Sequence, residues 1–128
     1  MNKIIRKIQY SEKVYRFDVE APLIAKSRKA GNFVIIRVDA NSERMPLTIA
    51  DADIEKGTIT LVVQKVGLSS TKLCNLNEGD EIHDVVGPLG NPTHIENFGT
   101  VLCAGGGVGV APMLPIIKAL KAAGNRVL

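Results

Sequence analysis

The first 98 residues alternate short apolar runs with turn-forming residues, and this pattern restricts the fold more than any other feature. Runs of β-type residues are separated by Gly, Pro, Asn and Asp at short intervals. Six such runs predict an all-β antiparallel barrel or sandwich of six strands. The expected strands are 3–10, 13–20, 33–38, 46–50, 58–66 and 81–86, with one short helix at 70–76.

The pattern changes at Gly99. Residues 100–104 form an apolar run, and a glycine-rich segment follows at 105–109. Residues 111–123 then place apolar side chains at helical spacing, and 126–128 resemble the opening of another strand. The order strand, glycine segment, helix, strand predicts the start of a parallel α/β sheet.

We therefore divide the chain into an all-β part, 1–98, and the first β–α–β piece of an α/β domain, 99–128. A complete nucleotide-binding α/β domain needs several such units of about 30 residues each, and one unit cannot cover both faces of its strands. The sequence thus indicates a truncated fragment of a longer protein, in which residues 100–128 self-associate or the last residues are disordered. The alternative is a complete small protein whose C-terminal segment packs on the barrel.

Composition narrows the possible functions. Apolar residues make up 45% of the 128, which suffices for a core, whereas aromatic residues make up 4% and Trp is absent. Aromatic platforms for single-stranded nucleic acid are therefore poorly supplied. The net charge of +3 is concentrated in residues 1–29, where eight Lys or Arg stand against three Asp or Glu. This basic part is either solvated or attracts an acidic partner, and it lacks the continuous basic block of a nucleic-acid arm.

Targeting signals and metal-ligand patterns are not evident. The sequence shows no signal peptide and no run of 18 apolar residues, so we expect a cytoplasmic protein without a membrane span. Cys74 and Cys103 stand 29 positions apart, which is not metal-ligand spacing, and we expect two free thiols and no metal site. His83 and His94 have no neighbouring ligand set and are interpreted as structural.

Three segments contain residues that could bind a phosphate or a ring of a ligand. Residues 67–73 follow a strand, and glycine and hydroxyl residues at a helix start can offer backbone N–H groups to a phosphate, although an ordinary serine cap would look similar. Arg44 can donate to a phosphate and Thr48 to a ring nitrogen, although both could be plain surface or strand residues. Residues 105–112 place four glycines in five positions after a strand, which suits a pyrophosphate or, alternatively, a flexible turn.

The order of these three segments resembles that of the ferredoxin–NADP reductase superfamily, over essentially the whole chain. Within it the chain is similar to electron-transfer small subunits, such as those of NADH-dependent ferredoxin–NADP oxidoreductase (sulfide dehydrogenase) and dihydroorotate dehydrogenase. The resemblance implies a six-stranded FAD-binding barrel at 1–98 and the beginning of an NAD(P)-binding domain at 99–128.

The resemblance also implies a function. The whole protein would be an NAD(P)H-dependent flavin oxidoreductase subunit that passes electrons between nicotinamide, FAD and iron–sulfur centres. Its partner would be a larger catalytic subunit carrying flavin or iron–sulfur groups, and ferredoxin is a further candidate. The [2Fe–2S] cluster of such subunits would lie beyond Leu128, and the fragment by itself would not turn over nicotinamide.

The resemblance assigns roles position by position. Residues 46–48 would lie against the isoalloxazine with Thr48 near N5, 63–65 would flank the ribityl and adenosine part, and 67–71 would hold the pyrophosphate of FAD. The turn at 105–112 would lie under the phosphates of the nicotinamide nucleotide. The expected FAD ligands are Arg44, Pro46, Leu47, Thr48, Val63, Gln64, Lys65, Gly67, Ser69, Ser70 and Thr71, and the expected NAD(P) ligands are Gly105, Gly106, Gly107, Val108, Gly109, Val110, Ala111 and Pro112.

The chain departs from the family pattern at two positions. Met45 stands where the superfamily motif has arginine, and Arg44, which precedes it, would point to the opposite face of the strand. Leu47 replaces the aromatic residue that often covers the flavin. Because flavin supplies the redox chemistry, we expect no catalytic acid or base. The alternative functions are a flavin-free β-barrel docking or assembly module and a polynucleotide binder, the latter disfavoured by the composition.

Overall fold

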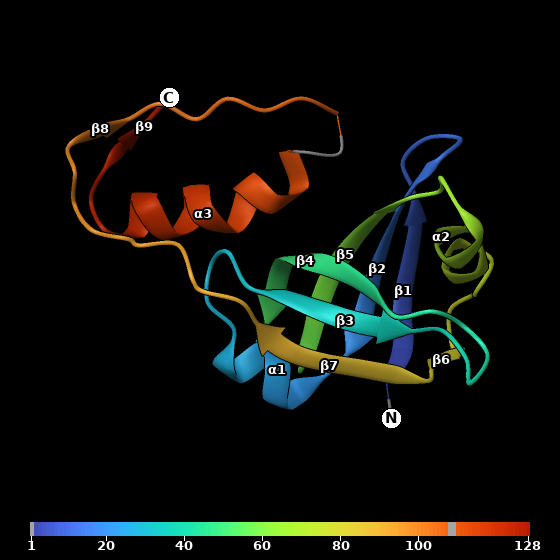
Figure 1. Cartoon of the computed structure of the whole chain (residues 1–128). Helices are drawn as coiled ribbons and strands as arrows, with labels where there is room; N and C mark the ends of the chain where they lie inside the picture. The colour runs from blue at the N-terminus through green and yellow to red at the C-terminus, as the bar shows by residue number, and fades with distance from the viewer. Residues whose placement is uncertain (1, 108–109) are drawn as a thin grey trace.

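The computed structural model describes residues 2–107 and 110–128. A strongly curved sheet with two short helices comprises residues 2–89, and a small strand–helix–strand unit lies to one side of it (Figure 1). The linker between them follows the last strand of the sheet, and the helix of the small unit faces the sheet (Figure 1).

The sheet has seven antiparallel strands in the order β6-β1-β2-β5-β4-β3-β7. Two helices, α1 at Pro22–Ser27 and α2 at Leu68–Cys74, are attached to it. The strands are β1 (Asn2–Gln9), β2 (Val14–Glu20), β3 (Phe33–Arg37), β4 (Met45–Asp53), β5 (Thr58–Gln64), β6 (Glu81–Ile82) and β7 (Asp84–Leu89). The all-β antiparallel fold predicted from the sequence is confirmed.

The predicted number of six strands is wrong, because the expected strand at 81–86 is two strands. His83 separates them and donates its backbone N–H to the carbonyl of Val38 at 3.2 Å. β6 pairs with β1 at one edge of the sheet, and β7 pairs with β3 at the other edge. Since one residue joins the two edges, the sheet curls back on itself into a barrel.

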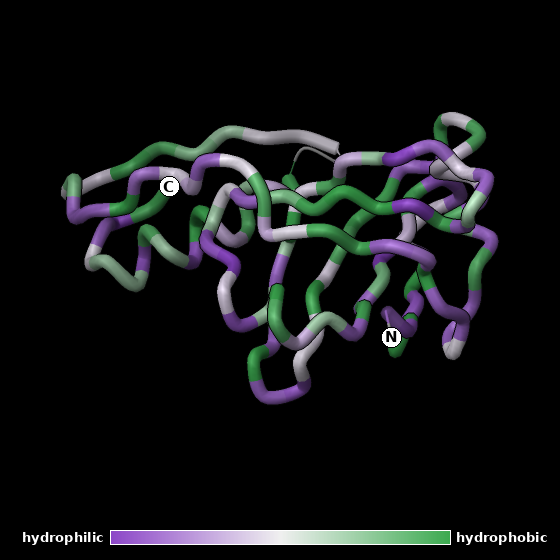
Figure 2. The backbone as a smooth tube through the Cα atoms, turned by 60° about the horizontal axis from the view of Figure 1, so that its bottom comes forward, coloured by the Kyte–Doolittle hydropathy of each residue, from purple (hydrophilic) through white to green (hydrophobic). Residues whose placement is uncertain are grey.

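Alternation of side chains along the strands builds the core. In β5, Ile59, Leu61 and Val63 are buried in the barrel, and the residues between them face outward. In Figure 2 the tube changes repeatedly between hydrophobic and hydrophilic colouring along the barrel strands. Helix α1, which the sequence pattern did not predict, begins at Pro22 and adds Ile24 and Ala25 to the core.

The C-terminal unit consists of β8 (Thr100–Val101), α3 (Val110–Ala122) and β9 (Arg126–Val127), and its two strands are parallel. The order of elements agrees with the prediction, but β8 ends at Val101 rather than at residue 104. In the described parts of the chain, no helix is long and apolar enough to cross a membrane.

Two buried asparagines hold the ends of the linker between the barrel and the C-terminal unit. The amide nitrogen of Asn32 donates to the carbonyls of Leu89 and Gly90, both at 3.1 Å. Asn125 is 7% exposed, and its amide oxygen accepts from the backbone N–H groups of Phe98 at 2.6 Å and Gly99 at 2.9 Å. The linker is therefore anchored at both ends by side-chain hydrogen bonds.

Replacing Asn125 by Ala should loosen the C-terminal unit and leave the barrel intact. The amide group of Asn125 also donates to the carbonyls of Glu96 and Leu120, so the substitution leaves several polar groups without their partners. We expect the local stability of β8 and β9 to fall by about 2 kcal/mol. Amide hydrogen exchange should become faster at Phe98, Gly99, Arg126 and Leu128 and stay unchanged in the barrel strands, whereas Asn91→Ala in the exposed linker should change nothing.

Candidate functional site

A groove of about 700 Å³ lies where β4 begins, β5 ends and α2 begins. Its walls come from three segments that are distant in the sequence but adjacent in the barrel. The lining residues are Asn41, Ser42, Glu43, Met45, Pro46, Leu47, Val62, Val63, Gln64, Val66, Gly67, Leu68, Ser69, Ser70 and Lys72.

The turn that leads from β5 into α2 is held by the hydroxyl of Ser70. Its Oγ accepts from the backbone N–H groups of Val66 at 3.0 Å and Gly67 at 2.9 Å, and it donates to the carbonyl of Gly67 at 3.1 Å. Ser70 is 6% exposed, so this hydroxyl is committed to the turn. The backbone N–H groups in the first turn of α2 have no partners within the helix and remain available to an anion.

Space and charge beside this turn suit a phosphate. A side chain added at Gly67 would meet nothing within 4 Å, so the backbone is open to close approach. Lys72 lines the groove, and its Nζ lies 3.4 Å from Ser42 Oγ and 3.7 Å from a carboxylate oxygen of Asp39. The hydroxyl of Ser42, the N–H of Asn41 and the charge of Lys72 together keep the pKa of Asp39 below its ordinary value.

Apolar surface accompanies these polar groups. Val66 and Leu68 are 75% and 77% exposed, and both line the groove next to the open turn. Single exposed apolar side chains are common, but two beside a row of free backbone donors suit a ligand that carries both phosphate and an apolar ring.

Seven of the eleven predicted FAD ligands line this groove: Pro46, Leu47, Val63, Gln64, Gly67, Ser69 and Ser70. The other four do not line it. Arg44 is exposed beside it, and Thr48 is half-buried in β4 opposite Phe33. Lys65 pairs its backbone N–H with the carbonyl of Lys13, and Thr71 lies within α2. Lys72 belongs to the 67–73 segment but is not among the predicted ligands, and sequence reasoning missed the 41–43 segment because only the folded barrel brings it to the turn.

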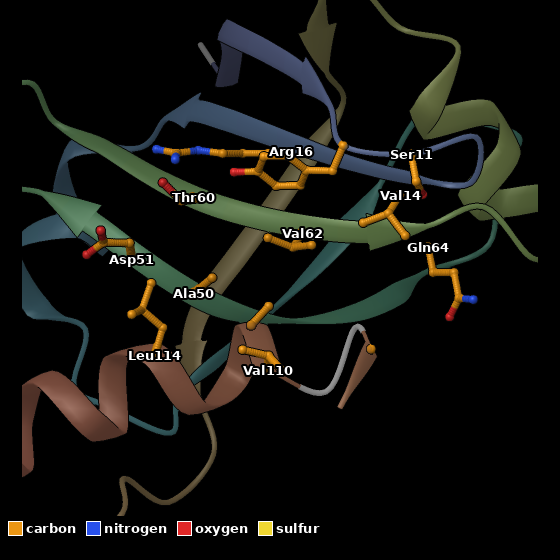
Figure 3. A pocket seen from close by; sticks show the side chains of 13 residues that line it. Ser11, Val14, Arg16, Ala50, Asp51, Thr60, Val62, Gln64, Val110 and Leu114 are labelled. Carbon is orange, nitrogen blue, oxygen red and sulfur yellow. The ribbon is translucent and has the colours of Figure 1, made fainter. Parts of the chain in front are cut away.

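A second cavity of about 740 Å³ lies between the outer face of β2, β5 and β4 and the beginning of α3. Figure 3 shows Val110 and Leu114 of α3 facing Ala50 and Val62 of the sheet. Val62 and Gln64 line both cavities, so the two meet at the end of β5. The lining residues are Tyr10, Ser11, Val14, Arg16, Ala50, Asp51, Thr60, Val62, Gln64, Gly107, Val110, Ala111 and Leu114.

A hydrogen-bonded row crosses the sheet wall of the second cavity. Arg16 donates from Nε and Nη2 to the two carboxylate oxygens of Asp18, at 3.1 and 3.3 Å. Thr60 Oγ1 donates to the same carboxylate at 2.7 Å. The side chains of Tyr10 and Asp18 raise the pKa of Arg16 above its ordinary value against the opposing effect of burial.

Three of the predicted NAD(P) ligands lie at the opposite wall. Gly105 is packed against Met113, whereas a side chain at Gly106 or Gly107 would meet nothing within 4 Å. Val108 and Gly109 lie outside the described residues. Val110, Ala111 and Pro112 begin α3. Gly107, Val110 and Ala111 line the second cavity, and the other described members of the set do not.

An ion pair joins α3 to the barrel. Lys118 Nζ lies 2.8 Å from one carboxylate oxygen of Asp51, and Arg28 lies 3.9 Å from the other. Burial is the largest single influence on the pKa of Asp51, and by itself it would raise this pKa. The hydrogen bonds from Lys118 and the N–H of Ala52, with the charges of Lys118 and Arg28, outweigh it, so this pKa lies below its ordinary value.

The two thiols take no part in either cavity. Cys74 is buried in the barrel core, and burial raises its pKa above the ordinary value. Cys103 is half-buried in the C-terminal unit. Across residues 2–107 and 110–128, His, Cys, Asp and Glu side chains form no group of three or more that could hold a metal ion.

Comparison with known families identifies the class of protein to which this barrel belongs. Residues 2–94 match the family model described as the oxidoreductase FAD-binding domain, and the chain belongs to this family. The resemblance inferred from the sequence is thereby confirmed at the level of the family.

Curated relatives are named as electron-transfer subunits. A Thermotoga maritima protein named dihydroorotate dehydrogenase B (NAD(+)), electron transfer subunit homolog, is 48% identical over 127 residues, which cover 99% of this chain and 45% of that protein. The dihydroorotate dehydrogenase B (NAD(+)) electron transfer subunit of Bacillus caldolyticus is 32% identical, with coverages of 92% and 48%. The chain therefore spans less than half the length of these relatives.

Solved structures share the architecture. The chain is similar to a chain of NADH-dependent reduced ferredoxin–NADP oxidoreductase, a structure described for flavin-based electron bifurcation, with 48% identity and a TM-score of 0.98 over 99% of this chain and 46% of that one. Phthalate dioxygenase reductase, at 24% identity and a TM-score of 0.80, covers 98% of this chain and 40% of its own, and shows the same fold.

Replacing Ser70 by Ala should loosen the turn before α2. The substitution removes the acceptor shared by the N–H groups of Val66 and Gly67, and we expect the free energy of unfolding to fall by about 1–2 kcal/mol. Chemical denaturation measures this change. Ser69→Ala, next to it in the groove, is the matched control and should leave stability within about 0.5 kcal/mol of wild type.

Replacing Asp51 by Asn should flatten the acid dependence of stability. Because the pKa of Asp51 is lowered in the folded protein, its charged form stabilises the fold above the ordinary carboxylate range, and this contribution is lost as the pH falls through the folded pKa. Thermal unfolding between pH 5 and about pH 3 should therefore show a smaller loss for Asp51→Asn than for wild type. Lys118→Met should flatten the same profile, and an unchanged profile in both variants would contradict the assignment.

Proposed function

We propose that this chain is the FAD-binding part of an electron-transfer subunit of an NAD(P)H-dependent oxidoreductase, which passes electrons between nicotinamide, FAD and iron–sulfur centres. The observation that carries the proposal is the groove at the end of β5, where free backbone donors, Lys72 and apolar side chains occur together. Membership in the FAD-binding domain family and the names of the relatives support the same cofactor and role.

The residues of the groove fit a dinucleotide. Gly67 leaves its backbone open, Ser69 lines the groove beside the free N–H groups of the first helical turn, and Lys72 adds positive charge. Ser70 would contribute indirectly, because its hydroxyl accepts the hydrogen bonds that hold the turn before α2 in shape. Pro46, Leu47, Val63 and Gln64 would bound the remainder of the cofactor. Arg44, Thr48, Lys65 and Thr71 adjoin the groove and would reach the cofactor only by adjustment of their side chains.

The second cavity would bring the nicotinamide nucleotide to the flavin. When bound, FAD accepts a hydride and releases electrons singly, which is the chemistry the protein itself lacks. Val62, Val110 and Leu114 give this cavity apolar walls. The glycine-rich turn, 105–112, would accept phosphates at the opposite wall, and no side chain is assigned as catalytic acid or base.

We extend the proposal to the organisation of the whole protein. Residues 1–98 would form the FAD-binding domain, and residues 99–128 the start of the NAD(P)-binding domain. The partner would be a larger subunit that carries flavin or iron–sulfur groups, and ferredoxin would be a further electron carrier. The protein would be located in the cytoplasm. Leu102 and Leu128, 79% and 58% exposed, would be the contact points if residues 100–128 self-associate.

Titration of the purified chain with FAD tests the proposal. We expect saturable binding with quenched or shifted flavin spectra, and weaker binding of FMN, which lacks the second phosphate and the adenosine. Gly67→Val should weaken FAD binding at least about tenfold, equivalent to about 1.4 kcal/mol, because its side chain occupies the space that a phosphate needs. The fold should survive, because the backbone of Gly67 is extended and an added side chain would meet no other atom within 4 Å.

Gly106→Val provides the matched control. Its side chain also meets nothing within 4 Å, but it lies in the glycine-rich turn, so FAD binding should match wild type. If the wild-type chain is colourless once unbound FAD has been removed, the proposal is rejected and a flavin-free docking module is favoured.

A further inference from the structure

The groove and the second cavity contain little aromatic surface for a planar ring. Leu47 lines the groove without offering a ring, and Phe17 is buried in the core. Tyr15 packs against Phe17 with ring centres 6.4 Å apart. Among the described residues, Tyr10 is the one aromatic side chain that lines either cavity.

The hairpin between β1 and β2 places Tyr10 at the second cavity. The N–H of Tyr10 donates to the carbonyl of Val14 at 2.8 Å, which closes the hairpin. In the register between β2 and β5, Val14 lies opposite Gln64 and Arg16 opposite Val62. The hairpin is therefore beside the end of β5, where the two cavities meet.

The side chain of Tyr10 is exposed at the second cavity. Tyr10 is 56% exposed, and it lines this cavity together with Arg16. Arg16 is fixed by two hydrogen bonds to Asp18, which also accepts from Thr60.

We propose that Tyr10 supplies the aromatic wall for the isoalloxazine ring of FAD. This inference rests on the proposed FAD binding. A dinucleotide with its phosphates at Gly67 can follow the shared residues Val62 and Gln64 around the end of β5 into the second cavity. Tyr10 belongs to the barrel wall of that cavity, whereas Gly107, Val110 and Ala111 line the opposite wall.

Tyr10→Leu tests the inference by removing the ring and keeping an apolar side chain of similar reach. We expect the Kd for FAD to rise about tenfold, in the range measured for aromatic stacking on a planar base. The fluorescence of bound FAD should also increase, because a tyrosine in contact with flavin quenches its emission by electron transfer. Tyr10→Phe should keep most of the affinity and lose most of the quenching.

Phe98→Leu is the matched control. Phe98 is 53% exposed, close to the value for Tyr10, but it packs against His94 in the linker and lines neither cavity. Its Kd and fluorescence should equal those of wild type.

The outcomes separate the inference from the proposal beneath it. If wild type binds FAD and Tyr10→Leu shows the same Kd and fluorescence, the inference is overturned and the proposed function stands. If wild type binds no FAD, both are overturned. Should Tyr10→Leu lower the Tm, Tyr10→Phe decides, because unchanged quenching in that variant also overturns the inference.

Discussion

The pairing of β5 with β2 on one side and β4 on the other is the interaction on which the rest of the structure depends. The inward side chains of β5, Ile59, Leu61 and Val63, occupy the centre of the core. Its outward side chains, Val62 and Gln64, line both cavities. The same alternation therefore stabilises the barrel and shapes the site, because successive side chains of a strand point to opposite faces.

The second cavity depends on how the C-terminal unit is held against the barrel. Asn32 and Asn125 anchor the two ends of the linker, and the ion pair between Asp51 and Lys118 joins α3 to β4. Asp51 also lines the cavity, so the contact that attaches α3 helps set the separation of the two walls. Buried amide groups suit this task, because each can satisfy several backbone groups that would otherwise be costly to bury.

Local patterns predicted most of the secondary structure. Alternation and turn residues located five strands, and the glycine segment followed by helical spacing located α3. They failed where a tertiary contact overrides the local pattern. The run at 81–86 is continuous in composition, yet His83 interrupts it because the chain passes between opposite edges of the sheet. The family model confirms the inferred cofactor class, whereas the assignment of individual ligands remains a prediction.

The sequence by itself determined the strand-rich barrel, the open turn at Gly67 and the class of cofactor, because these follow from periodicity, glycine placement and the order of motifs along the chain. Only the tertiary structure decided which distant residues share a wall. Tyr10, Arg16 and Thr60 come together through the register between β2 and β5, and Lys72 meets the 39–42 segment across the groove. Such neighbours are separated by 30 or more residues in most cases, and no local pattern records which strands will pair.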